Sequence, residues 1–162
     1  MKLSTRGRYG LRAMYDLALR YGEGPVPLNS IADRQMVSLH YLEQLMAKLR
    51  RAGLVASSRG AQGGYELAKQ PEEITVGDIV RVMEGSFDPV QCLSRDSDYE
   101  DCEQLEDCVV RFVWKRLRDC TNRVLDSINL QDLCDGTVTS EKKPCEACAP
   151  DSQKTTDECQ LS

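Results

Sequence analysis

The cysteines are the residues of this chain whose type and spacing most directly suggest chemistry. All eight lie between Cys92 and Cys159. Cys92, Cys102 and Cys108 follow the spacing C-x9-C-x5-C within an acidic segment. Three thiolates on one loop are a donor set for an iron–sulfur cluster or for zinc. The spacing is neither that of a zinc ribbon nor that of a ferredoxin, so thiols without metal are a third alternative.

The other five cysteines divide into two groups. Cys120 falls on an apolar stripe, and we expect it to be buried as a small apolar residue. Cys134, Cys145, Cys148 and Cys159 lie in or near a polar C-terminal segment. Its single C-x-x-C pair is weak evidence for zinc, and a redox-active or metal-binding tail is the alternative.

A second set of polar residues has the types that read DNA bases. Ser38, His40, Glu43 and Gln44 occupy the exposed start of a predicted helix, and Lys48 faces outward further along it. Glu can accept a hydrogen bond from cytosine N4, and Gln can pair with adenine. The alternative is an ordinary amphipathic helix with a solvated polar face. The exposed position of His40 favours base reading over metal ligation.

Arg59 is the corresponding candidate outside that helix. It lies at the tip of a predicted hairpin, next to glycines that allow the backbone to approach DNA closely. An arginine there can reach a phosphate or a narrow minor groove. The alternative is a tight turn that carries a solvated arginine.

Three helices are predicted to position these side chains. Apolar residues recur at helical spacing over residues 6–21, 28–34 and 39–52. Ser38 is a suitable N-cap for the third helix, and Gly53 stands where a C-cap glycine belongs. The apolar stripe of the third helix comprises Leu39, Leu42, Leu45, Met46 and Leu49.

A hairpin and a fourth helix follow. Two short strands, residues 54–58 and 65–68, flank a glycine-rich turn. The capping box Thr75-x-x-Asp78 then opens a helix that Gly85 closes. Helix, helix-turn-helix, hairpin and helix is the order of a winged helix-turn-helix domain. The predicted fold class is therefore mainly α with a small β-hairpin wing (α+β).

Four regions are predicted along the chain. Residues 1–85 form the DNA-binding domain, and residues 86–108 form an exposed cysteine-containing loop with 8 acidic residues. Residues 109–132 form a long dimerisation helix, and residues 133–162 are expected to be a disordered tail. The stripe that would pack against a symmetry mate comprises Val109, Val113, Leu117, Cys120, Val124 and Ile128.

The charge distribution agrees with a DNA-binding first half. Residues 1–59 carry 10 Lys and Arg against 4 Asp and Glu, whereas residues 60–162 carry 11 against 22. A basic surface favours phosphate binding. No apolar run approaches 18 residues, and the N-terminus lacks the apolar core of a signal peptide, so we expect no membrane partner and a cytoplasmic protein.

Catalysis is not expected from these residues. A cysteine nucleophile is usually activated by a nearby histidine. His40 is the only histidine in the chain, and it lies on the recognition helix. We therefore expect a binding protein and not an enzyme.

Several motifs together resemble the Rrf2 family of bacterial regulators, over residues 1 to about 130. Within that family the chain is most similar to the IscR-type branch, which regulates iron–sulfur cluster assembly. The matching segments are residues 1–9 (MKLSTRGRY), Ile31-Ala32, residues 38–45 (SLHYLEQL), residues 49–55 (LRRAGLV) and residues 58–65 (SRGAQGGY).

The resemblance implies a homodimer that binds a pseudo-palindromic operator in double-stranded DNA, with base contacts from His40 and Glu43 and a wing contact from Arg59. It also implies a cluster, [2Fe-2S] in preference to [4Fe-4S], held by Cys92, Cys102 and Cys108. Such a regulator, a repressor or dual regulator, would control cluster assembly or related stress genes. The alternative is a cluster-free regulator of the same family that responds to thiol oxidation or to a protein partner.

Three departures leave the fourth cluster ligand unassigned. The gap between the first two cysteines is longer than in well-known members. Arg111 stands where the assembly-regulator branch has a histidine, and Arg8 stands where a nitric-oxide-sensing branch has an acidic ligand. A guanidinium offers no free lone pair to iron. The remaining candidates in this subunit are Glu103, Glu106, Asp107 and, less favourably, Cys120.

Overall fold

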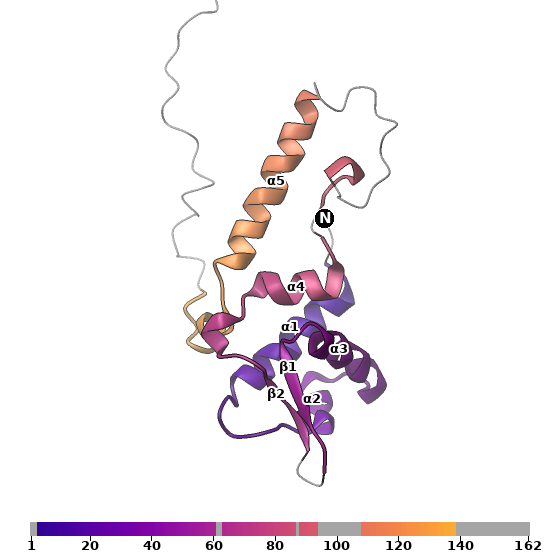
Figure 1. Cartoon of the computed structure of the whole chain (residues 1–162), viewed down its shortest axis with the longest axis vertical. Helices are drawn as coiled ribbons and strands as arrows, with labels where there is room; N and C mark the ends of the chain where they lie inside the picture. The colour runs from indigo at the N-terminus through magenta and orange to yellow at the C-terminus, as the bar shows by residue number, and fades with distance from the viewer. Residues whose placement is uncertain (1–2, 61–62, 87, 94–107, 139–162) are drawn as a thin grey trace, which may run out of the picture.

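In the part of the chain that the structure describes, α-helices precede and follow one β-hairpin (Figure 1). The structure, a computed structural model, describes residues 3–60, 63–86, 88–93 and 108–138. In chain order the elements are α1 (Thr5–Ala18), α2 (Leu28–Gln35), α3 (Leu39–Arg51), β1 (Val55–Ser58), β2 (Gly64–Leu67), the 3-10 turn η1 (Pro71–Glu73), α4 (Val76–Glu84), the 3-10 turn η2 (Gln91–Leu93), α5 (Val109–Asp126) and α6 (Leu130–Cys134). This order confirms the predicted winged helix-turn-helix with mainly α content.

Side-chain caps start the helices where the sequence places them. Ser38 caps α3, because its hydroxyl oxygen accepts from the Tyr41 backbone N–H at 3.3 Å. Thr75 and Asp78 form the reciprocal capping box of α4, with hydrogen bonds of 3.0 and 3.1 Å. Each cap satisfies backbone donors that the first helical turn leaves unpaired. Both predicted starts are confirmed.

The hairpin pairs β1 with β2 in antiparallel register. Val55 lies opposite Leu67 at the base, and Ser58 lies opposite Gly64 toward the tip. Gly64 also lies against the backbone of Val26, where an added Cβ would collide with the carbonyl group. This close approach holds the tip-side end of β2 against the segment that precedes α2.

An apolar core joins helices α1–α4 and α6 to the hairpin, and α5 lies outside it. Its largest fully buried side chains are Met14, Leu17, Ile31, Leu42, Leu45, Met46, Leu49, Ile74, Ile79 and Leu130. The predicted stripe of α3 is confirmed except at Leu39, whose side chain is 40% exposed. Leu39 is the first residue of α3 and precedes the turn that rests on the core, so the prediction was wrong there.

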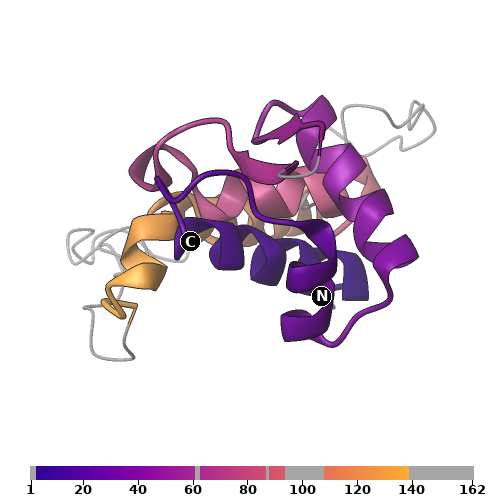
Figure 2. The ribbon, with the colours of Figure 1, turned by 90° about the horizontal axis from the view of Figure 1, so that it is seen from below.

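Helix α1 packs unusually closely on α4. A Cβ at Gly7 would meet the Glu84 carboxylate, and a Cβ at Gly10 would meet the Met83 side chain. Glu84 Oε1 accepts from the Gly7 backbone N–H at 2.8 Å, so α4 supplies an anion to the first turn of α1. Figure 2 shows α1 running alongside α4, with α6 at one end.

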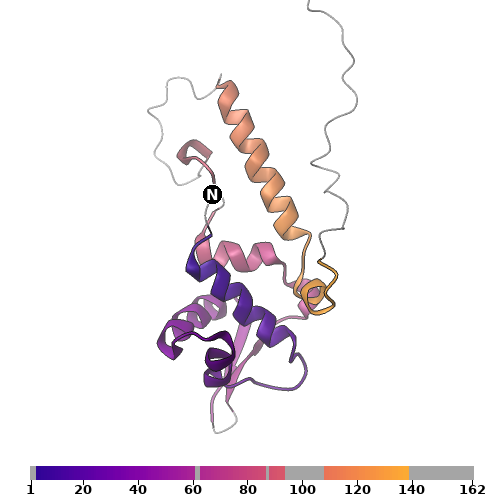
Figure 3. The same ribbon diagram turned by 180° about the vertical axis from the view of Figure 1, so that it is seen from behind.

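The C-terminal helical region is divided, unlike the single helix predicted over residues 109–132. Helix α5 ends at Asp126, and α6 begins at Leu130 after the N-cap Asn129. The break follows from pairing with the strand-like segment before α4: Val76 donates to the Ile128 carbonyl, and Leu130 donates to the Ile74 carbonyl. Helix α5 then rises away from the winged-helix domain (Figures 1 and 3). Among the described helices, none is long and apolar enough to cross a membrane.

Candidate nucleic-acid interface and cysteine segment

The first turns of α3 present a polar, exposed face. Ser38, His40, Glu43 and Gln44 are all exposed. The side chain of His40 is 82% exposed, and its Nδ1 lies 3.8 Å from Glu43 Oε2. Gln44 Nε2 lies 3.1 Å from His40 Nε2. These three side chains therefore form one contiguous group, able to offer both donors and acceptors to base edges.

The C-terminal half of α3 contacts the hairpin. Lys48 is half-buried, so it is less prominent than the other predicted contacts. Arg50 Nη1 donates to Ser57 Oγ of β1 at 3.2 Å and links the recognition helix to the wing. Arg59 is exposed beyond β1, and Gly60 follows with a positive φ of 114°. The structure thus places the helix face and the wing arginine on adjoining elements.

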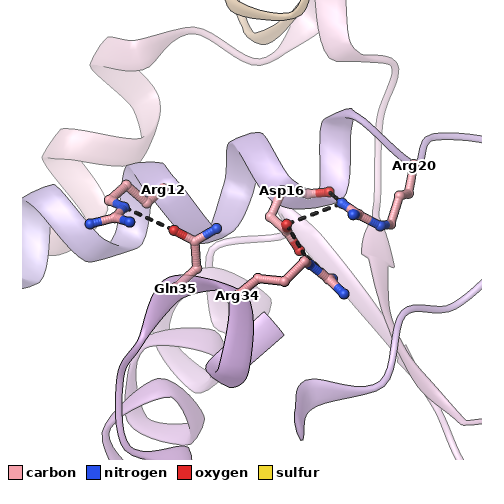
Figure 4. Close-up of polar contacts among 5 residues, drawn as sticks. All are labelled: Arg12, Asp16, Arg20, Arg34 and Gln35. Carbon is pink, nitrogen blue, oxygen red and sulfur yellow. Dashed lines mark hydrogen bonds and ion pairs between the residues drawn. The ribbon is translucent and has the colours of Figure 1, made fainter. Parts of the chain in front are cut away.

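A buried ion-pair group fixes the helix-turn-helix to α1 (Figure 4). Asp16 of α1 is 4% exposed. It accepts from Arg34 of α2 at 2.6 and 2.9 Å and from Arg20 at 3.0 Å. The hydrogen bond to Asp16 is the largest influence on Arg34 and raises its pKa above the ordinary value. Sequence reasoning missed this group, for which the only local signal was the i,i+4 spacing of Asp16 and Arg20.

Two of the three predicted cluster ligands lie in the described part of the chain. Cys92 in η2 and Cys108, the N-cap residue of α5, are half-buried free thiols. Cys102, with the fourth-ligand candidates Glu103, Glu106 and Asp107, falls outside the described residues. Within the described residues no group of three or more metal-binding side chains is present. The structure therefore supplies a partial donor set of the right chemical type.

Arg118 attaches the segment that carries Cys92 to α5. Its Nη1 donates to the Leu93 carbonyl at 3.4 Å and lies 3.5 Å from Asp88 Oδ1. The side chain of Asp88 is only 8% exposed. The hydrogen bond to the neighbouring Asp119 is the largest influence on Arg118 and raises its pKa above the ordinary value. A change in the Cys92 segment can therefore act directly on α5.

Cys120 does not have the environment predicted for it. It is half-buried and disulfide-bonded, so it is not simply a small apolar residue in a core. Its stripe on α5 faces solvent in the single chain, which explains the difference. In this state Cys120 offers no free thiolate.

Four of the other five residues of that stripe are exposed, and Ile128 is half-buried. Val109 is 76% exposed, Val113 is 60%, Leu117 is 45% and Val124 is 39%. Helix α5 has no buried residue in the single chain. An apolar face of this extent on an 18-residue helix is typical of a surface that a partner covers.

Comparisons with known proteins agree with this arrangement. The Rrf2 family, described as an iron-dependent transcriptional regulator, matches residues 3–136. The HTH-type transcriptional regulator CymR of Bacillus subtilis (strain 168) is 51% identical over 137 residues, 85% of this chain and 92% of CymR. The solved structure of CymR, the global cysteine regulator of B. subtilis, has a TM-score of 0.69 and 48% identity, and covers 84% of this chain and 98% of that chain.

A second relative comes from the branch that the sequence motifs resemble. The HTH-type transcriptional regulator IscR of Aliivibrio salmonicida (strain LFI1238) is 45% identical over 133 residues, 82% of this chain and 77% of that protein. Both relatives are DNA-binding transcriptional regulators and not enzymes. This chain belongs to the Rrf2 family of transcriptional regulators.

Proposed function

We propose that this regulator binds a pseudo-palindromic operator as a homodimer. Ser38, His40, Glu43 and Gln44 would read base edges in the major groove, with Lys48 and Arg59 on the backbone or in the minor groove. The exposed, mutually contacting group on the first turns of α3 supports this reading. The exposed apolar stripe of α5 supports a second copy of the chain as the partner that covers it.

The signal in this proposal is an iron–sulfur cluster held by Cys92, Cys102 and Cys108. One observation carries it: Cys92 and Cys108 are free, half-buried thiols at the two ends of the segment that contains Cys102. Thiolate sulfur is the ligand that iron–sulfur clusters require. A bound cluster would add charge to this segment and would link the three cysteines to one another. Both effects would be reversed when the cluster is lost, so the cluster would favour one conformation of the pair of subunits.

The chain's own contacts give this signal a route to DNA. Arg118 joins the Cys92 segment to α5. Arg81 of α4 bonds to Asp126 of α5 at 2.7 Å, and Glu84 of α4 bonds to the start of α1. Helix α1 holds α2 through Asp16 and Arg34. A shift of α5 can therefore change the placement of the recognition helix through contacts already present.

Selection of DNA from a random pool tests the proposal. Full-length protein purified without oxygen should select a site with a dyad and with half-sites about one helical turn apart. Affinity for that site should change when iron is removed with a chelator. Selected sites without a dyad would contradict the dimeric docking. Equal affinity of iron-loaded and iron-free protein would contradict the cluster as the signal.

A second candidate function shares the DNA-binding surface but needs no cluster. Cys120 is disulfide-bonded, and the relative CymR is described as the global cysteine regulator of B. subtilis. Thiol oxidation, or a protein partner bound at the cysteine segment, would then set the DNA affinity. Colourless protein whose operator affinity responds to a thiol reductant would favour this candidate.

A further inference from the structure

The side chain of Arg12 contacts two different parts of the molecule. Together with Leu11, Val80 and Leu125 it lines a groove between α1, α4 and α5. Its Nε also donates to Gln35 Oε1, at the end of α2, at 2.8 Å (Figure 4). Leu125 belongs to α5, the helix whose apolar stripe the second copy would cover. One arginine therefore connects a groove beside the proposed subunit contact to the helix-turn-helix.

Tyr9 makes a second link between α1 and the helix-turn-helix. Its ring packs edge-on against the Tyr41 ring of α3, with centroids 6.1 Å apart and planes at 87°. The guanidinium carbon of Arg12 lies 5.6 Å from the centroid of the Tyr9 ring, a cation–π contact that orients both side chains. The Tyr41 hydroxyl is buried and has no hydrogen-bond partner among the described residues. The packing of the two rings therefore joins the recognition helix to α1.

The turn after Gln35 has a backbone conformation that side chains rarely adopt. Met36 lies in the left-handed region, with φ 53° and ψ 46°. Among the described residues it is the only one other than glycine with a positive φ. Such a conformation persists where surrounding contacts hold it. The bond from Arg12 to Gln35, the residue directly before Met36, is one of these contacts.

Two bonds of different character join α1 to the end of α2 (Figure 4). Asp16 is four residues after Arg12, and its buried carboxylate pairs with Arg34. Breaking that pair would leave a buried charge without a partner, which is costly. The bond between Arg12 and Gln35 is exposed, so water can replace either partner at small cost. The Arg12 bond is therefore the adjustable one of the two.

We infer that Arg12 and Tyr9 are positioning residues, which set the orientation of the recognition helix relative to the subunit contact. The inference rests on the proposed docking of α3 in DNA and on α5 as the contact between two copies. Helix α4 bonds to α1 through Glu84 and to α5 through Arg81, so α1 is tied to the subunit contact. Arg12 and Tyr9 then tie the helix-turn-helix to α1. Neither side chain has to touch DNA in this role.

The tolerance of binding to half-site spacing tests this role. Full-length protein is titrated with its selected operator and with the same operator lengthened at the centre by one base pair, about 3.4 Å. Wild-type protein should strongly prefer the selected spacing. Arg12→Met and Gln35→Leu each remove the bond with little change in size. The ratio of the two affinities should fall by about two- to tenfold in each, the range that one hydrogen bond supports.

Conservative variants and a control separate positioning from general damage. Gln35→Glu keeps the acceptor and Tyr9→Phe keeps the ring, so both should retain the wild-type preference for spacing. Tyr9→Leu removes the ring and should behave as Arg12→Met does. The control is Arg6→Ala, which removes the same charge from an exposed position of α1 that does not line the groove. Its preference should equal that of wild-type protein.

The double variant of Arg12→Met and Gln35→Leu should lose no more preference than either single variant, because all three lack the same bond. Additive losses, or single variants with the wild-type preference, would overturn the positioning role. A smaller salt slope in Arg12→Met than in Arg6→Ala would show that Arg12 binds phosphate, and would also overturn it. Thermal unfolding of each variant checks that the compared proteins are folded.

Failure of this inference is distinguishable from failure of the proposed function. Wild-type protein that selects sites without a dyad would contradict the dimeric docking, and this inference with it. Wild-type protein that prefers one spacing, together with variants that prefer it equally, would contradict the role of Arg12 and Tyr9 alone.

Discussion

At the scale of single residues, Glu43 is the side chain from which base preference is expected. Its carboxylate is 53% exposed and lies beside His40 on the first turns of α3. A carboxylate in the major groove accepts from cytosine N4 and rejects bases that present only acceptors.

Glu43→Ala should therefore change which bases are selected. Discrimination at one position of each half-site should fall by about 1–3 kcal/mol, measured as relative affinities for single-base operator variants. Glu72→Ala, an exposed carboxylate in η1, is the control and should leave the preferences unchanged. A Glu43→Ala profile that matches wild-type at every position would remove Glu43 from the base-reading set.

Arg59 should contribute charge rather than base choice. Arg59→Ala should weaken binding to all operator variants by a similar factor and reduce the salt slope by about 1.8 for a dimer. Titrations at several salt concentrations measure both effects. Loss of affinity confined to operators with A·T pairs under the wing would instead indicate minor-groove reading.

At the scale of elements, the capping box of α4 shows how a local motif supports the route between α5 and α1. Thr75 and Asp78 cap the helix, and Asp78 also accepts from Arg81, which bonds to Asp126. Partial burial of Asp78 tends to raise its pKa. The hydrogen bonds with Thr75 and Arg81 outweigh that effect, so the pKa of Asp78 lies below its ordinary value of 3.8.

Removing the cap should destabilise the domain. Thr75→Ala should lower the free energy of unfolding by about 1 kcal/mol, measured by urea denaturation at pH 7. Because the pKa of Asp78 is lower in the folded state, its contribution is present above pH 3.8 and is lost as the pH falls further. The difference between wild-type and Asp78→Asn should therefore shrink as the pH falls below 3.8. A difference that stays constant over this range would contradict the assignment to the ionised carboxylate.

Local sequence patterns predicted most elements, because periodicity, caps and glycines act within a few residues. The starts of α3 and α4 are examples, since each depends on a side chain adjacent to the helix. Helix α6 was not predicted, because five residues carry too little periodicity and backbone pairing with residues 74–76 fixes its position. Asp16 was missed for a similar reason, since its partner Arg34 comes from another helix.

The candidate site shows the same division. The exposed group on α3 could be predicted from the helix period alone, because buried positions recur every three or four residues and leave the opposite face exposed. The environment of Cys120 could not, because the stripe that carries it remains exposed in one chain. The attachment of Cys92 to α5 depends on Arg118, which is 25 residues from Leu93 in sequence. Such contacts follow only from the tertiary fold.

At the scale of the whole molecule, α5 is the surface through which two copies would associate. Val113→Asp should shift the protein from dimer to monomer, because it places a charge in the middle of the exposed stripe. Light scattering after size-exclusion chromatography measures the mass. Lys115→Ala is the control, since Lys115 lies about 200° around the helix from Val113. Dimeric Val113→Asp protein would show that another surface joins the subunits.

The central claim concerns the three cysteines, and iron and sulfide analysis of anaerobically purified protein tests it most directly. Wild-type protein should be brown and contain iron and acid-labile sulfide in equal amounts. Cys92→Ala, Cys102→Ala and Cys108→Ala should each lose both, together with the visible absorption. A chain that ends at Val138 keeps α6 and should retain the full signal without Cys145, Cys148 and Cys159. A full cluster signal in Cys102→Ala, or colourless wild-type protein that contains zinc, would contradict the claim.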